Sequence, residues 1–148
     1  MRLLKQVGAL CVRRADDGSQ EVLLVTSRET GRWVIPKGWQ DGKLKGYEAA
    51  AREASEEAGV TGKITNKAIG SFRYSKRLDS GERSVLVSVF LLAVEEQKAR
   101  WPEQHQRQRA WFTANLAAQR VSEPGLKKMI KSVAHLGASS KKSALTKL

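Results

Sequence analysis

The chain has 148 residues, of which 41% are hydrophobic, and carries a formal net charge of +12 with a pI near 10.2. This length fits one domain with a single core. No run approaches the roughly 20 apolar residues of a membrane helix, so we expect no membrane span. No signal-peptide pattern is present, so we do not expect secretion. The chain has one cysteine, Cys11, which excludes an internal disulfide and favours a cytoplasmic location. The positive charge predicts a polyanionic partner, a class that includes nucleotides, polyphosphorylated small molecules and nucleic acid.

The first part of the chain predicts short strands joined by turns. Residues 5–13 are rich in Val and Leu, residues 15–19 carry a turn signal, and residues 21–27 predict a second strand, so we expect a hairpin. Residues 33–35 predict a further short strand. Pro36 should end it, because proline lacks the N–H that a sheet ladder needs.

A glycine-containing loop and a helix come next. Gly38 permits a backbone turn that other residues resist. Residues 47–58 predict a helix whose alanines form a narrow apolar face, small enough to approach a sheet closely. Gly59 should end this helix in the left-handed conformation.

Three carboxylates on the predicted helix indicate a metal site. Glu53, Glu56 and Glu57 are spaced by three and four residues, a spacing that places them on one helix face. Like charges on one face repel, and hard divalent ions such as Mg²⁺ prefer carboxylate oxygens. A solvated acidic face is the alternative interpretation of these three residues taken alone.

The order of strand, glycine loop and acidic helix resembles the box motif of the Nudix hydrolase family. Gly38 stands fourteen residues before Arg52, as that motif requires, and Leu44 is the one departure, because the family has a glutamate there. The resemblance implies an α/β/α sandwich with a mixed sheet. The matching positions are Gly38, Arg52, Glu53, Glu56, Glu57, Gly59 and Val60.

The resemblance also implies roles for the box residues. The family's box helix holds Mg²⁺ or Mn²⁺ ions that bridge a diphosphate, and water attacks one phosphorus. Glu53 and Glu57 are then the chief metal ligands, with the carbonyl of Gly38 completing the set. Glu56 is either a ligand or the general base, and Arg52, four residues before it, is expected to orient it. The loss of glutamate at position 44 puts the geometry of the loop in question.

The rest of the chain predicts more strands and two helices. Residues 63–74 predict a strand with a kink at Gly70, residues 84–94 a central strand, and residues 107–112 a last strand. The two helices should span residues 113–119, with Thr113 as N-cap, and residues 124–136, with Pro124 in the first turn. We therefore expect one domain over residues 1–136, followed by a flexible basic tail over residues 137–148.

Substrate choice is predicted from residues outside the box. Over most of residues 5–134 the chain is similar to the diphosphoinositol polyphosphate and diadenosine polyphosphate phosphohydrolases, whose substrates are crowded with phosphate and suit a strongly basic enzyme. Trp39, in the box loop, is a candidate to stack on a base. The cations expected to bind substrate phosphates are Arg28, Arg32, Lys37 and Arg109. Three acids outside the box are alternative metal ligands, although surface positions suit them better: Glu95, Glu96 and Glu103.

Other functions compete with this one. The same motif suits an enzyme that clears unwanted nucleotides or trims RNA 5′ ends, and the basic tail favours RNA. Leu44 supports a non-catalytic module that binds polyphosphate. A plain nucleic-acid-binding protein lacks support, because no recognised nucleic-acid-binding motif is present. We expect a monomer without membrane association.

Overall fold

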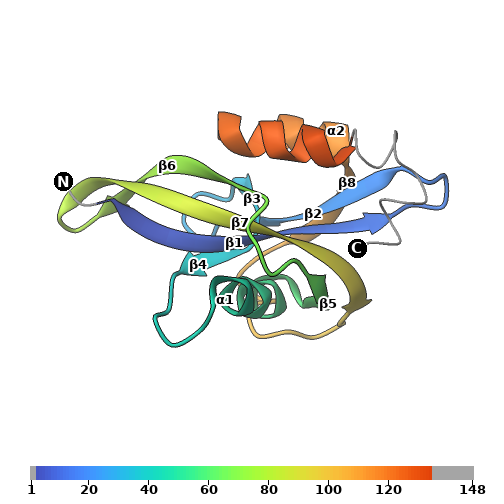
Figure 1. Cartoon of the computed structure of the whole chain (residues 1–148), viewed down its shortest axis with the longest axis horizontal. Coiled ribbons are helices and arrows are strands. Elements are labelled where there is room, and N and C mark those ends of the chain that lie inside the picture. Colours follow the sequence, from blue (N-terminus) through green and yellow to red (C-terminus); the bar gives the residue numbers. More distant parts are fainter. Residues whose placement is uncertain (1–2, 135–148) are drawn as a thin grey trace.

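The computed structural model describes residues 3–134, in which one mixed sheet lies between helices on its two faces (Figure 1). The predicted α/β/α sandwich is confirmed. The strands are β1 (Leu4–Arg14), β2 (Gln20–Thr26), β3 (Trp33–Val34), β4 (Lys37–Trp39), β5 (Val60–Ile64), β6 (Gly70–Leu78), β7 (Gly81–Gln97) and β8 (Arg109–Thr113). The helical elements are α1 (Gly46–Glu53), a π-helical turn η1 (Ala54–Ala58), α2 (Ala114–Arg120) and a helix over residues 124–134.

The centre of the sheet is a parallel pair, β1 beside β7, and the strand order is β3-β2-β1-β7-β5. The other pairings are antiparallel, with β4 on β1, β6 on β7 and β8 on β2. The hairpin predicted for the first two strands is confirmed by the antiparallel register of β1 and β2. The parallel pair joins segments some 80 residues apart in the chain, so no local turn signal could indicate it.

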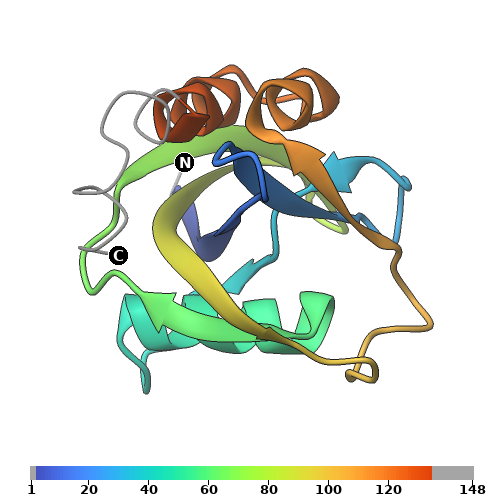
Figure 2. The same ribbon diagram turned by 90° about the vertical axis from the view of Figure 1, so that its right-hand side faces the viewer.

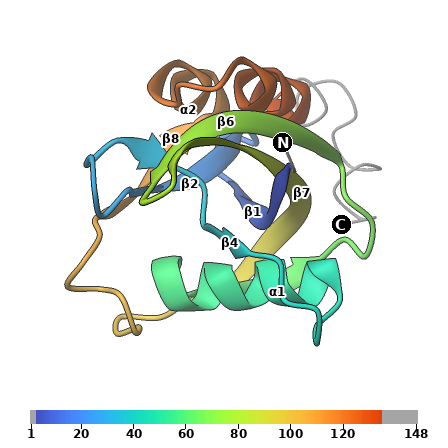
Figure 3. The same cartoon turned by 90° about the vertical axis from the view of Figure 1, so that its left-hand side faces the viewer.

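Each face of the sheet is covered by different helices, as Figures 2 and 3 show. Side chains of one strand alternate between the faces, because successive residues point to opposite sides. Leu10 and Val12 of β1 therefore pack with α2 and the helix over residues 124–134, whereas Ala9 and Cys11 pack with α1. Cys11 is fully buried, and burial raises the pKa of its thiol.

Several predicted boundaries differ from the structure. The strand expected over residues 63–74 is two strands, β5 and β6, which both pair with β7 and are separated by residues 65–69. Seven residues of this edge, from Ile64 to Gly70, face the four of β7 from Leu92 to Val89, so the extra residues must leave the ladder. β7 runs to seventeen residues, longer than the apolar segment that predicted it, because its polar ends still pair with neighbours.

The helix ends follow the expected capping. Thr113 accepts a hydrogen bond through Oγ1 from the N–H of Leu116, at 3.3 Å, so the predicted N-cap of α2 is confirmed. The end of the helix predicted over residues 124–136 and the tail over residues 137–148 lie outside the described residues. Among the helices over residues 3–134, none combines the length and apolar character needed to span a bilayer.

Candidate active site

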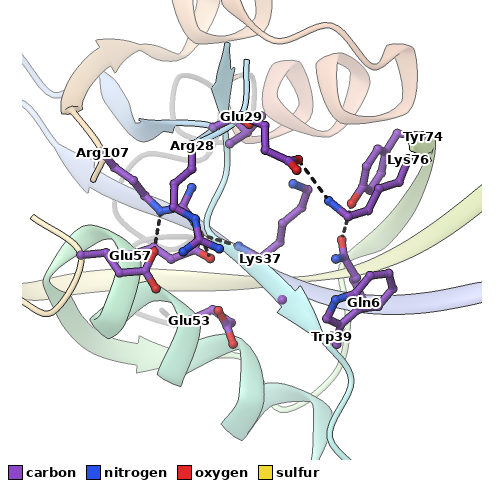
Figure 4. Close-up of a pocket in the computed structure, with 14 residues that line it drawn as sticks. Gln6, Arg28, Glu29, Lys37, Trp39, Glu53, Glu57, Tyr74, Lys76 and Arg107 are labelled. Atoms are coloured by element: carbon purple, nitrogen blue, oxygen red, sulfur yellow. Dashed lines mark hydrogen bonds and ion pairs between the residues drawn. The ribbon is translucent and has the colours of Figure 1, made fainter. Parts of the chain in front are cut away.

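A cleft of about 620 Å³ opens beside α1, between β4 and the loops that follow β2 and precede β8 (Figure 4). Two carboxylates line the helix side of this cleft, and the strand and loop side carries more basic than acidic side chains. The charged lining residues are Arg28, Glu29, Lys37, Glu53, Glu57, Lys76, Glu103 and Arg107. Gln6, Gly38, Trp39 and Tyr74 also line the strand side, so five segments distant in sequence build this site together.

The acidic helix brings two of its three carboxylates into the cleft. Glu53 ends α1 and Glu57 lies in η1, and both line the cleft, whereas Glu56 does not. In a π-turn the hydrogen bonds span five residues, so each residue turns through a smaller angle than in an α-helix. Glu57, four residues after Glu53, is then nearly one full turn away and points in almost the same direction as Glu53. Glu56, three residues after Glu53, is well short of a full turn and points in another direction. The widened turn thus separates Glu56 from the face that ideal α-helical spacing assigned to it.

The carboxylates of Glu53 and Glu57 are poorly solvated. Burial raises the pKa of Glu57 to about 8, since the residue is only 5% exposed, and the neighbouring Glu53 raises it further against the opposing effect of Arg107. Burial likewise raises the pKa of Glu53, with the charge of Glu56 adding to the shift. Two adjacent carboxyls with raised pKa values form a site that a proton or a cation would occupy.

Gly38 makes room for Glu53. A Cβ atom added to Gly38 would lie 2.4 Å from the carboxyl carbon of Glu53, closer than real side chains approach. The backbone N–H of the preceding Lys37 donates to Oε1 of Glu57 at 3.2 Å. Glycine at position 38 therefore lets β4 approach Glu53 closely, and the N–H at position 37 binds β4 to Glu57.

Arg107 pairs with carboxylates of the cleft, a role that the sequence did not predict. Its guanidinium lies 3.3 Å from Oε2 of Glu57 and 2.8 Å from Oε1 of Glu103, and it also donates to the carbonyl of Thr26 at 3.1 Å. Glu103 thus lines the cleft and is paired there, although the sequence favoured the surface for it. The four-residue spacing of Glu103 and Arg107 could have indicated their ion pair, but only the fold brings that pair to Glu57.

The segment over residues 98–109 fixes the end of the acidic helix. Four successive carbonyls there, from Glu56 to Gly59, each accept a hydrogen bond from this segment. The donors are the N–H of Glu103 at 3.0 Å, Nε1 of Trp101 at 3.0 Å, Nη1 of Arg109 at 2.8 Å and the N–H of Lys98 at 2.8 Å. Because a helix leaves its last carbonyls without internal partners, these bonds hold Glu57 in place.

Arg109 therefore has a different position from the one expected. Its guanidinium stacks on the ring of Trp101 at 3.7 Å and donates to two backbone carbonyls, those of Ala58 and Lys98. It does not line the cleft, and its donors are directed at the helix end. Gly59, in the left-handed conformation as predicted, leaves space for this stack, since an added Cβ would lie 2.8 Å from Arg109.

Arg52 also differs from expectation. Its guanidinium lies 3.6 Å from Oδ2 of Asp41 in the box loop, and within residues 3–134 it forms no ion pair with Glu56. Asp41 accepts a further hydrogen bond from the N–H of Lys43 at 2.8 Å, so one aspartate ties the loop to the helix. Leu44, where the family has glutamate, packs against the core beneath the helix. The loop is thus held without a carboxylate at position 44.

The remaining predicted substrate residues fall into two groups. Arg28, Lys37 and Trp39 line the cleft, and Trp39 is 45% exposed at its edge, where a flat ligand can reach it. Figure 4 shows the Lys37 side chain extending away from α1, and its ammonium lies 4.9 Å from the centre of the Tyr74 ring. Arg32 lies outside the cleft and lines a neighbouring hollow, where Nη1 donates to Ser122.

The donor set fits one hard divalent cation. Over residues 3–134 no group of three or more His, Cys, Asp and Glu side chains converges closely enough to hold a metal by itself. Mg²⁺, however, is often held by one or two carboxylates and completes its shell with water and substrate phosphate. Glu53 and Glu57, with raised pKa values and no room for a side chain at Gly38, provide that pair.

Comparisons with known proteins agree with this architecture. A family model described as NUDIX domain matches residues 4–133. Nudix hydrolase 13, mitochondrial, of Arabidopsis thaliana is 36% identical over 104 residues, which cover 66% of this chain and 51% of the relative. Diphosphoinositol polyphosphate phosphohydrolase 3-alpha of Mus musculus is 35% identical over 111 residues, covering 73% of this chain and 63% of the relative.

A solved structure extends the comparison to the fold. The C. elegans Ap4A hydrolase binary complex superposes with a TM-score of 0.67 at 21% identity and covers 92% of this chain and 98% of that one. At that identity the likeness concerns the fold alone. The chain spans about half the length of the Arabidopsis relative it matches, so the activity of the whole relative does not transfer directly.

Proposed function

The chain belongs to the Nudix family, and from this premise we propose that it is a pyrophosphohydrolase that uses Mg²⁺ or Mn²⁺ to cleave a phosphoanhydride bond. The observation that carries the proposal is the pair of half-buried Glu53 and buried Glu57, which share one cleft with Arg28 and Lys37. Its substrate is a nucleoside-diphosphate-linked or polyphosphorylated small molecule. Diadenosine and diphosphoinositol polyphosphates are the leading candidates, a choice supported by the names of the mouse relative and the C. elegans structure.

The residues of the cleft divide the chemistry between them. Glu53 and Glu57 would hold the cation, which when bound polarises phosphate oxygens and lowers the pKa of a coordinated water. Arg28 and Lys37 are placed to bind phosphate oxygens and to offset the negative charge that grows as phosphorus is attacked. Arg107 keeps Glu57 in position. Glu56, expected from the sequence to be a ligand or the general base, does not line the cleft.

Two other functions use the same cleft. An enzyme that clears nucleotides or trims RNA 5′ ends would need the same carboxylates, and the tail that favoured RNA lies outside the described residues. A non-catalytic binding module rested on Leu44, but Asp41 and Arg52 hold the loop without the family's glutamate, which weakens that reason. The cytoplasmic location and the monomeric state stay predictions from the sequence.

The proposal is tested with a panel of substrates in Mg²⁺ or Mn²⁺, with products identified by mass. We expect cleavage of diadenosine polyphosphates, and we expect Glu57→Gln to lower the rate by about 100-fold or more, because it removes a charge at the metal. Glu95→Gln, which changes an exposed carboxylate outside the cleft, should leave the rate unchanged. Affinity for polyphosphates without cleavage at any metal concentration would instead identify a binding module.

A further inference from the structure

The two carboxylates proposed to hold the cation lie on either side of a change in helical winding. Glu53 is the last residue of α1, and Glu57 lies in the π-helical turn η1 that follows it. The direction of the Glu57 side chain relative to Glu53 therefore depends on the width of this turn. If η1 were wound as an α-helix, Glu57 would rotate about the helix axis and its carboxylate would move relative to that of Glu53.

The π-turn is supported from outside the helix. The carbonyl groups at a helix end have no partners within the helix. The segment between β7 and β8 passes beside this helix end, as Figure 2 shows, and supplies donors to it. The carbonyl of Glu56 accepts from the N–H of Glu103 at 3.0 Å, and the carbonyl of Glu57 accepts from Nε1 of Trp101 at 3.0 Å. Trp101 thus bonds directly to the backbone of one of the two proposed metal ligands.

The indole of Trp101 is held in place by its own neighbours. The guanidinium of Arg109 stacks on the ring at 3.7 Å, and a Cβ atom added to Gly59 would lie 2.8 Å from Cγ of the indole. The backbone N–H of Trp101 donates to Oε1 of Gln104 at 2.9 Å, and its carbonyl accepts from the N–H of Gln104 at 3.2 Å. Because an indole has a single N–H, this fixed ring directs its one donor at the carbonyl of Glu57.

Trp101 is not one of the residues that line the cleft, so its effect on the chemistry there must pass through Glu57. Mg²⁺ demands near-ideal octahedral geometry from its ligands. Loss of a residue that orients a metal ligand typically lowers metal affinity by about 10- to 100-fold. A small rotation of Glu57 is therefore expected to affect metal binding more than it affects the stability of the fold.

We propose that Trp101 is a positioning residue of the metal site. Its indole N–H holds the carbonyl of Glu57 and thereby keeps the π-turn that directs the Glu57 carboxylate to the same side as Glu53. Arg109 contributes to the same function, because it stacks on the indole and donates to the next carbonyl, that of Ala58, at 2.8 Å. The inference rests on the proposed function, since Glu53 and Glu57 must hold the cation for Trp101 to matter.

Titration of the metal-free protein with Mn²⁺, followed by the EPR signal of the free ion, tests this role without substrate. Trp101→Phe removes the N–H but keeps a ring on which Arg109 can stack. We expect the Kd for Mn²⁺ to rise about tenfold or more, and the EPR spectrum of the bound ion to change with its ligand geometry. Arg109→Met, which removes the adjacent donor, should change the Kd in the same direction.

Trp111→Phe is the matched control. Trp111 also donates through Nε1, to Oε1 of Gln97 at 2.8 Å, and also carries a stacked arginine, Arg13, at 4.0 Å. Its acceptor, however, lies at the end of β7 and not in η1. We expect this substitution to leave the Kd for Mn²⁺ unchanged, even if it lowers the Tm as much as Trp101→Phe does.

Three results would contradict the inference or its premise. An unchanged Kd in Trp101→Phe, or in Arg109→Met if Trp101→Phe does not fold, would overturn the positioning role. An equal rise of the Kd in Trp111→Phe would also overturn it, because the effect would then be a general loss of stability. Failure of the wild-type protein to bind Mn²⁺ would instead overturn the proposed function and the positioning role with it.

Discussion

Replacing Arg107 with methionine should destabilise the metal-free protein, and Mg²⁺ should restore much of the loss. Arg107 lies 3.3 Å from Glu57, which is 5% exposed and has a pKa raised to about 8, so above that pH the substitution leaves a buried carboxylate without its cation. Removing one member of a buried ion pair costs about 3–5 kcal/mol. For a chain of this size the corresponding fall in Tm is about 6–20 °C. The apolar stem of methionine keeps the packing, so the change reports on charge.

Mg²⁺ bound between Glu53 and Glu57 would replace the missing positive charge. A ligand at 100 times its Kd stabilises the folded state by about 2.7 kcal/mol, which is close to the predicted loss. Without Arg107 competing for Glu57, the variant should bind Mg²⁺ more tightly than the wild type does. The gain in Tm on adding Mg²⁺ should therefore be larger for Arg107→Met than for the wild type.

Thermal unfolding above pH 8, where Glu57 is ionised, measures both effects in EDTA and in Mg²⁺, with Arg13→Met as the control. Arg13 also pairs with a carboxylate, that of Glu21, and stacks on Trp111, but it does not line the cleft, so its loss should be the same in both buffers. If Arg107→Met and Arg13→Met respond alike to Mg²⁺, or if Arg107→Met leaves the Tm in EDTA unchanged, then Glu57 does not depend on Arg107 and the metal site is wrongly placed.

Two further predictions concern the same carboxylates. Burial raises the folded-state pKa of Glu57 to about 8, against an ordinary value of 4.5, so between these limits the folded state holds a proton that the unfolded state has lost. Below pH 4.5 the stabilising contribution of Glu57 to the metal-free protein should be complete. It should be lost as the pH rises to about 8. The Tm difference between wild type and Glu57→Gln, followed from pH 5 to 8 in EDTA, should change in this direction, and a change of opposite sign would contradict the assigned burial. Gly38→Ala should lower kcat, because the added Cβ would lie 2.4 Å from the carboxyl carbon of Glu53 and must displace it, whereas Gly42→Ala, with nothing within 4 Å, should not. Equal activity of the two alanine variants would show that the position of Glu53 is not critical.

Local patterns in the sequence determined several secondary-structure elements and the box residues of the site. The β1–β2 hairpin, the Thr113 cap and the left-handed Gly59 each depend on residues a few positions apart, so spacing was enough to predict them. The box motif likewise located Glu53, Glu57 and Gly38, because one loop and one helix carry all three.

The tertiary structure decided the partners of these residues. Arg107 reaches Glu57 and Arg109 turns to the helix end because the segment over residues 98–109 crosses the last carbonyls of the acidic helix. Two arginines only two positions apart thus have different roles, which composition and charge alone do not distinguish. Glu56 leaves the cleft because the helix widens into a π-turn after Glu53, and helical spacing in a sequence assumes regular turns. The charge of Glu123 acts on the pKa of Lys37, although 86 residues of chain separate the two. Contacts of that range depend on strand order and loop path, and these are set by the packing of the whole core.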